Sequence, residues 1–181
     1  MMKHTFNDGF TALELMITVS IAAIVMVVAV PSYQGVLERN RLKQVLEGYK
    51  VDLQLTRTEA LKRQTPVVIS RKAGAAGAWC YGLTVKNDCD CAVSDSTAAD
   101  FCELKRIDSA NFGAIALAAQ SANTNTFDPR RGTTGASGVT FTSEQYAGRV
   151  IVSNTGRVKS CAPTGGLLPS GKKGLPSLSD C

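Results

Sequence analysis

The chain has 181 residues and a formal net charge of +5, a length that allows an N-terminal helix and one globular domain of about 110 to 120 residues. No Gly-rich nucleotide motif or Ser-Lys motif is present, and carboxylates cluster only in the Asp88–Asp90 loop. Oxygen ligands in that loop suit a cation such as Ca²⁺, but the calcium-loop motif is absent. We therefore expect no enzymatic activity, no cofactor and no metal site.

An apolar helix is the first predicted element, over residues 10–30, behind a polar segment of nine residues. Its 21 residues would extend about 31 Å as a helix, enough to cross the hydrocarbon core of a bilayer. Glu14 is the only charged residue in this run. Because a carboxylate in hydrocarbon is costly, such a residue is usually functional and has a partner. The pattern predicts a transmembrane helix that carries one functional glutamate.

The start of the apolar run carries a more specific pattern: Gly9 before Phe10, then Glu14, then Pro31. This pattern closely resembles the N-terminus of type IV pilins and type II secretion pseudopilins. In that class a prepilin peptidase cuts after the glycine, here Gly9, and methylates the new N-terminal residue, here Phe10. Cleavage would remove residues 1–9, which contain the only histidine of the chain. The processed protein would then have no histidine for catalysis or metal ligation.

The resemblance also implies partners and a location. Glu14 would pair with the freed amine of Phe10 in a neighbouring subunit, because opposite charges attract strongly in a low dielectric. The expected partners are other pilins or pseudopilins, the prepilin peptidase, the inner-membrane assembly platform and the membrane. The expected location is the inner membrane, as a single-pass protein with a periplasmic globular domain, and then a pilus or pseudopilus.

An amphipathic continuation of the helix is predicted over residues 31–64. Pro31 removes one backbone donor and should kink or loosen the helix. Thr65-Pro66 should end it, because a residue before proline avoids helical geometry. Most charged residues, Asp52 and Arg57 among them, fall outside one stripe of apolar or small residues that recur every three or four positions. The stripe consists of Leu42, Leu46, Tyr49, Leu53, Thr56 and Ala60.

The remaining residues, 65–181, alternate strand and turn signals. Strands are predicted at 66–71, 79–86, 101–107 and 139–141. The clearest hairpin joins 149–153 to 157–161 through Asn154-Thr155-Gly156. Segment 112–119 fits either a short helix or a strand, and 127–138 is predicted to be turn. The tail from Ala162 is expected to be loop, tied down only by a disulfide to Cys181.

Cysteine usage indicates disulfides. The even count, in a domain expected to face the periplasm, favours bridges over free thiols. Cys161–Cys181 is the preferred bridge, with two more among the other four cysteines, although six cysteines allow 15 pairings. The alternative is a metal site around Cys89-Asp90-Cys91, which lacks a Cys-x-x-Cys motif. The six positions are Cys80, Cys89, Cys91, Cys102, Cys161 and Cys181.

The helix stripe must bury against another element, and an antiparallel sheet with one apolar face is the natural partner. The predicted fold class is α+β and pilin-like: a long N-terminal helix, half transmembrane and half amphipathic, packed on an antiparallel β-sheet. The predicted segments are a leader over 1–9, a transmembrane or filament-core helix over 10–30, the amphipathic helix over 31–64, and a β-rich, disulfide-stabilised domain over 65–181.

Motifs in the globular part resemble the GspH/FimT group of pseudopilins and minor pilins. They are Asn40-Arg41-Leu42, the stretch from Arg57 to Arg63, and the pattern from Phe127 through Gly132 and Phe141 to Gly156-Arg157. The resemblance implies a minor pilin that takes part in filament initiation and assembly. The alternative with the same fold is a type II secretion pseudopilin. A C-terminal disulfide loop is typical of type IV pilins and favours the pilus.

DNA binding is a further alternative. Residues 104–181 contain nine Lys or Arg against four Asp or Glu, a balance of +5, and basic loops neutralise phosphates without sequence preference. Some FimT-type pilins bind DNA through a Gly-Arg-x-Arg motif, which Gly156-Arg157-Val158-Lys159 resembles. Lys159 keeps the charge of the last arginine and loses its bidentate geometry. The candidate residues are Arg157, Lys159, Lys172 and Lys173; the competing interpretation is a solvated hairpin face.

Overall fold

The computed structural model describes residues 10–120 and 122–181. The predicted leader, residues 1–9, and the cleavage site at Gly9 lie outside the described residues. The chain divides into two compact units, one ending at Leu37 and one comprising Glu38–Cys181. The single long helix, α1 (Ala12–Arg63), contributes residues to both units.

The first unit is helical. Thr11 precedes α1, and its Oγ1 accepts a hydrogen bond from the backbone N–H of Glu14 at 3.2 Å, which satisfies one of the free donors at the helix start. The helix runs without a break through Pro31, where the sequence predicted a kink or loosening. Residues 10–30 were also predicted to be transmembrane, whereas no helix in the described part of the chain combines the length and apolar character needed to cross a membrane.

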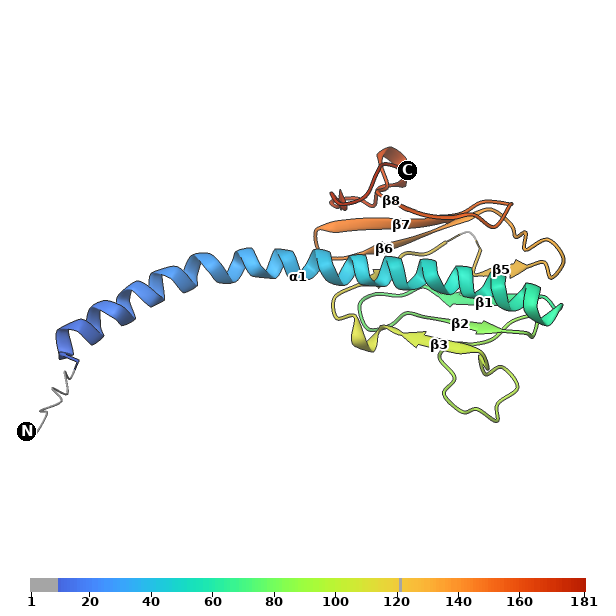
Figure 1. Ribbon diagram of the computed structural model, residues 1–181, viewed down its shortest axis with the longest axis horizontal. Helices are drawn as coiled ribbons and strands as arrows, with labels where there is room; N and C mark the ends of the chain where they lie inside the picture. Colours follow the sequence, from blue (N-terminus) through green and yellow to red (C-terminus); the bar gives the residue numbers. More distant parts are fainter. Residues whose placement is uncertain (1–9, 121) are drawn as a thin grey trace, which may run out of the picture. The chain divides into compact units, whose positions relative to one another are not determined.

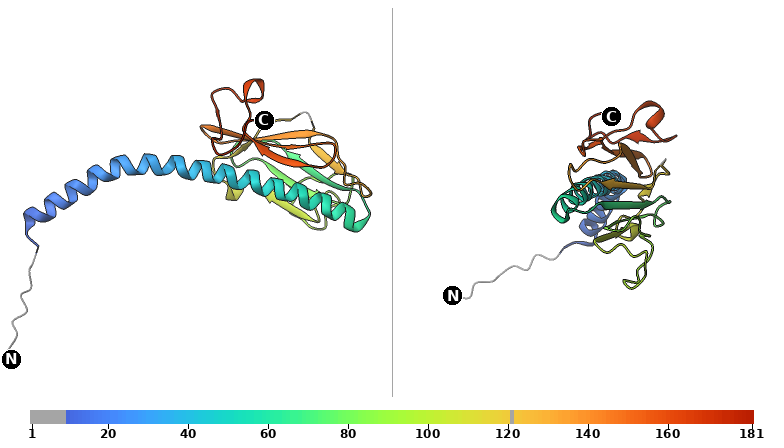
Figure 2. Two further views of the ribbon diagram at one scale, coloured as in Figure 1. Left: turned by 45° about the horizontal axis from the view of Figure 1, so that its top comes forward. Right: turned by 90° about the vertical axis from the view of Figure 1, so that its right-hand side faces the viewer.

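In the second unit, α1 buries the predicted stripe. All six of its residues, from Leu42 to Ala60, are at most 1 % exposed, which confirms that prediction. Val45 joins them. Asp52 was expected on a solvated face but is only 1 % exposed, because the turn of the helix that carries Leu53 and Thr56 also brings Asp52 against the sheet. In the end-on view of Figure 2, this part of α1 lies against the sheets.

Two sheets, rather than the single predicted sheet, cover the part of α1 that lies in the second unit (Figure 1). The first has the order β3-β2-β1-β5, and all its pairs are antiparallel. It consists of β1 (Val67–Lys72), β2 (Cys80–Thr84), β3 (Lys105–Asp108) and β5 (Thr124–Phe127). The second has the order β4-β6-β7-β8, with β9 also paired to β7. It consists of β4 (Ala116–Leu117), β6 (Ser137–Thr142), β7 (Tyr146–Val152), β8 (Val158–Cys161) and β9 (Lys173–Gly174).

Most predicted strands are confirmed. The hairpin is β7–β8, with Val152 opposite Val158, and segment 112–119 contains the short strand β4. Strand β5 was missed, since its sequence Thr-Asn-Thr-Phe lacks the apolar alternation of a strand. Two single-turn 3-10 helices, Ser109–Asn111 and Gly165–Leu167, complete the described elements.

The C-terminal tail is more ordered than the sequence predicted. Strand β9 pairs in parallel with the start of β7, and a bridge joins Ala162 to Asp180. Leu175 is 1 % exposed and belongs to the main core, and its N–H donates to the carbonyl of Ala147 at 2.9 Å. A disulfide is therefore not the only tether, because a buried leucine and a strand pairing also hold the tail.

Candidate functional site

The first candidate site is the exposed apolar surface of the N-terminal unit. Phe10 is 81 % exposed, and the large apolar residues that follow it on α1 are also exposed: Leu13, Leu15, Met16, Ile17, Val19, Ile21, Ile24, Val25, Met26 and Val27. They surround the helix rather than form one stripe. A contiguous apolar surface of this kind indicates contact with protein or lipid.

Glu14 interrupts this surface with a negative charge. It lies in the first turn of α1, where a carboxylate is favoured by the helix dipole. Its side chain is exposed, and it has no ion-pair partner among the residues the structure describes. Nothing in the helix therefore neutralises the charge, which leaves it available to a group from outside this chain.

All six cysteines form disulfides: Cys80–Cys91, Cys89–Cys102 and Cys161–Cys181. The predicted bridge Cys161–Cys181 is confirmed. The four other cysteines form a buried cluster over β2, where a Cβ on Gly82 would collide with Cys102. Although Cys80, Asp90 and Cys91 lie within 4.8 Å of one another, both sulfurs are consumed in the bridge, so no thiolate is left for a metal.

A cavity of about 370 Å³ lies between β1, the disulfide-bonded loop and the start of β5. Asp88, Asp90 and Asp100 line it, and Lys72 faces Asp90 at 3.6 Å. Among the described residues these three carboxylates do not converge into a set of ligands within 4.8 Å of one another. The geometry therefore does not support the Ca²⁺ alternative for this loop.

Two buried charges join α1 to the first sheet. Asp52 accepts hydrogen bonds from Tyr81 Oη at 2.9 Å and Lys105 Nζ at 2.5 Å, and burial together with the Asp52 charge raises the pKa of Tyr81. Arg71 Nη1 donates to Tyr49 Oη at 2.8 Å and to Asn125 Oδ1 at 2.6 Å. Burial raises the pKa of Tyr49 despite that arginine. Both Asp52 oxygens are satisfied within the core, whereas Arg71 Nε is buried without a hydrogen-bond partner among the described residues.

The four predicted DNA-contacting residues do not form one patch. Arg157 lies opposite Ser153 at one end of β7, whereas Lys173 pairs with Tyr146 at the other end. Ser153 and Tyr146 are separated by seven positions in the sequence, which corresponds to about 23 Å along a strand. Lys159 lies near the Arg157 end and Lys172 near the Lys173 end. The four residues are divided between two places because β8 and β9 lie one after the other along the same edge of β7.

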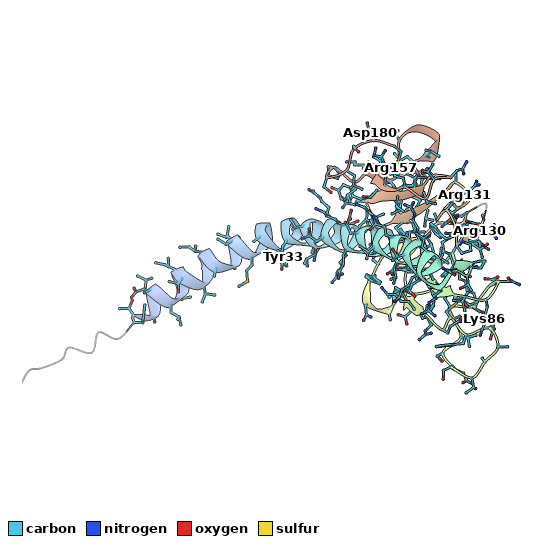
Figure 3. The ribbon with its side chains drawn as sticks, turned by 45° about the vertical axis from the view of Figure 1, so that its right-hand side comes forward. Tyr33, Lys86, Arg130, Arg131, Arg157 and Asp180 are labelled. Carbon is cyan, nitrogen blue, oxygen red and sulfur yellow. A yellow bond between two sulfur atoms is a disulfide. The ribbon has the colours of Figure 1, made fainter. Side chains whose placement is uncertain are left out.

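Two other segments lie against the turn that precedes Arg157. The loop that contains Arg130 and Arg131 packs on the β7–β8 turn, where Thr134 N–H donates to the carbonyl of Asn154 at 3.2 Å. Arg57 of α1 lies beneath both segments. Figure 3 shows Arg130, Arg131 and Arg157 on the surface of this domain. Sequence reasoning missed this group, because its members are separated along the chain by up to 100 positions.

Comparison with known families identifies the chain. Residues 49–156 match the family described as "Type II transport protein GspH", and this segment covers more than half of the chain. The chain belongs to the GspH family. The resemblance to GspH/FimT pilin-like proteins that the sequence suggested is therefore correct, and the α+β fold with a long N-terminal helix on antiparallel strands is the one expected.

Two solved structures are similar to this GspH-family chain, both of the type IV minor pilin FimU of Pseudomonas aeruginosa strain PAO1 in different crystal forms. The first is 22 % identical with a TM-score of 0.49, covering 75 % of this chain and 94 % of FimU. The second is 19 % identical with a TM-score of 0.47, covering 73 % and 96 %. No curated protein matches the sequence.

Proposed function

We propose that this GspH-family chain is a minor pilin, a subunit of a type IV pilus that takes part in filament initiation and assembly at the inner membrane. The observation that carries the proposal is the apolar N-terminal half of α1, whose large side chains are exposed on all faces. Such a helix is stable in water only when other apolar surfaces cover it. Neighbouring pilin helices supply that cover in a filament, which gives the protein a structural rather than a catalytic role.

Processing is part of the proposal. The leader over 1–9 would be removed after Gly9, and Phe10 would become a methylated N-terminus. The new amine would then be free to meet Glu14 of a neighbour. Intact-mass analysis of protein extracted from cells with an active prepilin peptidase should show a chain that begins at methylated Phe10. Retention of residues 1–9 in those cells would contradict this step.

Deletion of the gene tests the function itself. We expect the deletion strain to lose most or all of its surface pili and the wild-type gene to restore them. Secretion of proteins by the type II system should be unchanged. The alternative supported by the family description is a pseudopilin of type II secretion, which predicts the reverse: normal pili and retained substrates inside the cell. Fractionation of the strain that carries the wild-type gene tests the proposed inner-membrane location. Protease added to its intact cells and to its spheroplasts tests the periplasmic position of the globular domain, which should be cut only in spheroplasts.

DNA binding is a second candidate function, favoured by one observation. Arg157 and Lys159 are both exposed and have no ion-pair partner among the described residues. Binding should ignore DNA sequence and weaken steeply with salt.

Gel shifts should show which end of β7 contributes more to DNA binding. We expect Arg157→Ala/Lys159→Ala to weaken DNA binding at least tenfold, while Lys172→Ala/Lys173→Ala, which removes the same charge from the other end, changes it less. Equal binding by the wild type and by the Arg157/Lys159 variant would reject a DNA-binding role for this hairpin.

A further inference from the structure

The cavity beside β1 carries negative charge that the chain does not neutralise, and we call it the acidic cavity. Its volume of about 370 Å³ lies in the range of cavities that receive ligands. Asp90 lies 3.6 Å from Lys72 Nζ, whereas Asp88 and Asp100 are exposed and have no ion-pair partner among residues 10–120 and 122–181. Arg71 also lines the cavity, but its guanidinium donates to side chains of the core. Two exposed carboxylates are therefore available to a positively charged group from outside the chain.

The loop that carries these carboxylates is held in place. Two disulfides anchor it over β2. Asp88 Oδ1 accepts hydrogen bonds from Ser70 Oγ of β1 at 2.5 Å and from the N–H of Cys89 at 2.8 Å. The N–H of Asp90 donates to the carbonyl of Asp100 at 2.8 Å. The loop is thus ordered before a partner arrives, which reduces the entropy lost on binding.

The loop after β5, residues 128–133, carries the opposite charge, and we call it the arginine loop. Arg130 and Arg131 are both exposed and form no ion pair within the described part of the chain. Their backbone N–H groups donate to Asp128 Oδ1, each at 2.9 Å, which fixes the backbone of the loop. Two positive charges are therefore presented to solvent by an ordered loop.

The acidic cavity and the arginine loop lie toward opposite ends of the β1–β5 pair. Lys72 ends β1 and lines the cavity. Val67 begins β1 and pairs with Phe127, the residue directly before the arginine loop. The five positions from Val67 to Lys72 correspond to about 17 Å along a strand. The two surfaces are therefore separated on one sheet, and each is available to another molecule.

We propose that the acidic cavity receives the arginine loop of a second copy of this chain, with Arg130 and Arg131 pairing with Asp88 and Asp100. Guanidinium and carboxylate groups form charge-assisted pairs of hydrogen bonds, and the opposite charges draw the two surfaces together. Because each copy contributes a different patch, the contact is heterologous and lets copies add head to tail. It goes beyond the proposed function, since it lies in the globular unit and uses no residue of the exposed apolar helix.

The test measures self-association of the full chain in a non-ionic detergent by sedimentation velocity over a series of protein concentrations. Association should be evident at about 0.05 M NaCl and should weaken at least about tenfold at about 0.5 M, because salt screens exposed charges. Association through the apolar helix would not weaken with salt in this way. A chain that is monomeric at every concentration in low salt would overturn the proposal.

Two charge-reversal variants test the two surfaces. Asp100→Arg alters only the acidic cavity, and Arg130→Glu/Arg131→Glu alters only the arginine loop; each alone should weaken self-association at least about tenfold. An equimolar mixture of the two variants should associate again, because the intact arginine loop of the first meets the intact cavity of the second. A mixture that associates no better than each variant alone would contradict a head-to-tail contact.

A matched control separates this contact from a general effect of net charge. Lys172→Glu/Lys173→Glu changes the charge of the same domain by the same amount as the arginine variant and should associate as the wild type does. Circular dichroism and the thermal unfolding midpoint should be unchanged in all variants, since the substituted side chains are at the surface. Equal weakening by the arginine and lysine variants would overturn the proposed contact.

Discussion

At the scale of single residues, Asp52 joins the helix to the sheet. Its carboxylate accepts from Tyr81 and Lys105, and Asp52 is buried while the Lys105 side chain is 38 % exposed. Asp52→Asn should therefore destabilise the protein by about 2–3 kcal/mol, less than for a fully buried pair. Urea unfolding of the full chain in detergent measures the change. Asp100→Asn, at an exposed position, should change stability by less than about 0.5 kcal/mol; equal effects of the two substitutions would contradict this account.

Glu14 acts at the same scale but through another subunit. At 4 Å and an effective dielectric constant of 20, a pair of opposite charges is worth about 4 kcal/mol, so losing the Glu14 charge should reduce incorporation into filaments at least tenfold. Glu14→Ala should leave the globular unit folded. Quantitative blotting of sheared filaments against whole cells measures incorporation. Thr18→Ala changes a polar residue in the same exposed helix and should have little effect; normal incorporation of Glu14→Ala would make the charge incidental.

At the scale of elements, two glycines lie in different surroundings. Gly148 lies in β7, where a Cβ would collide with Leu46 of α1, whereas a Cβ on Gly48 of α1 meets nothing within 4 Å. Gly148→Ala should destabilise the protein by about 1–3 kcal/mol through overpacking. Gly48→Ala should stabilise it by about 0.5–1 kcal/mol, because alanine has the higher helix propensity.

Urea unfolding of both glycine variants tests the packing of helix on sheet. If Gly148→Ala left stability unchanged, the close approach of β7 to α1 would be wrong. If Gly48→Ala were destabilising, this face of α1 would be covered rather than open.

At the scale of the whole molecule, three disulfides cross-link the globular unit, two of them over β2 and one at its C-terminal end. Thiol titration under denaturing, non-reducing conditions should find no free sulfhydryl. Cys161→Ser/Cys181→Ser opens a loop with a sequence separation of 20 residues, and should cost about 3 kcal/mol on the loop-entropy estimate. Leu175 and β9 should keep the tail packed on the domain without the disulfide. Loss of the disulfide should therefore lower the unfolding midpoint without abolishing folding. Reactive thiols in the wild-type chain would contradict the three bridges.

The sequence by itself determined the features that depend on local pattern. Apolar or small residues that recur every three or four positions identified the stripe from Leu42 to Ala60, and the Gly9-Phe10-Glu14 pattern suggested the class of pilins and pseudopilins. Turn chemistry at Asn154-Thr155-Gly156 located the β7–β8 hairpin. These signals are local because helical periodicity, capping and turn geometry are set by residues within a few positions of one another.

Only the tertiary structure decided what depends on residues distant in the sequence. The pairing of Cys80 with Cys91 and Cys89 with Cys102, the burial of Asp52 against Lys105, and the approach of Arg57 to Gly132 and Gly156 all follow from which strands lie beneath the helix. The same packing separated Arg157 from Lys173, because charges carry no information about the strand edge on which they will lie. Composition therefore showed that this half of the chain is basic, while the order of strands in the sheet determined at which end of β7 each of these positive charges lies.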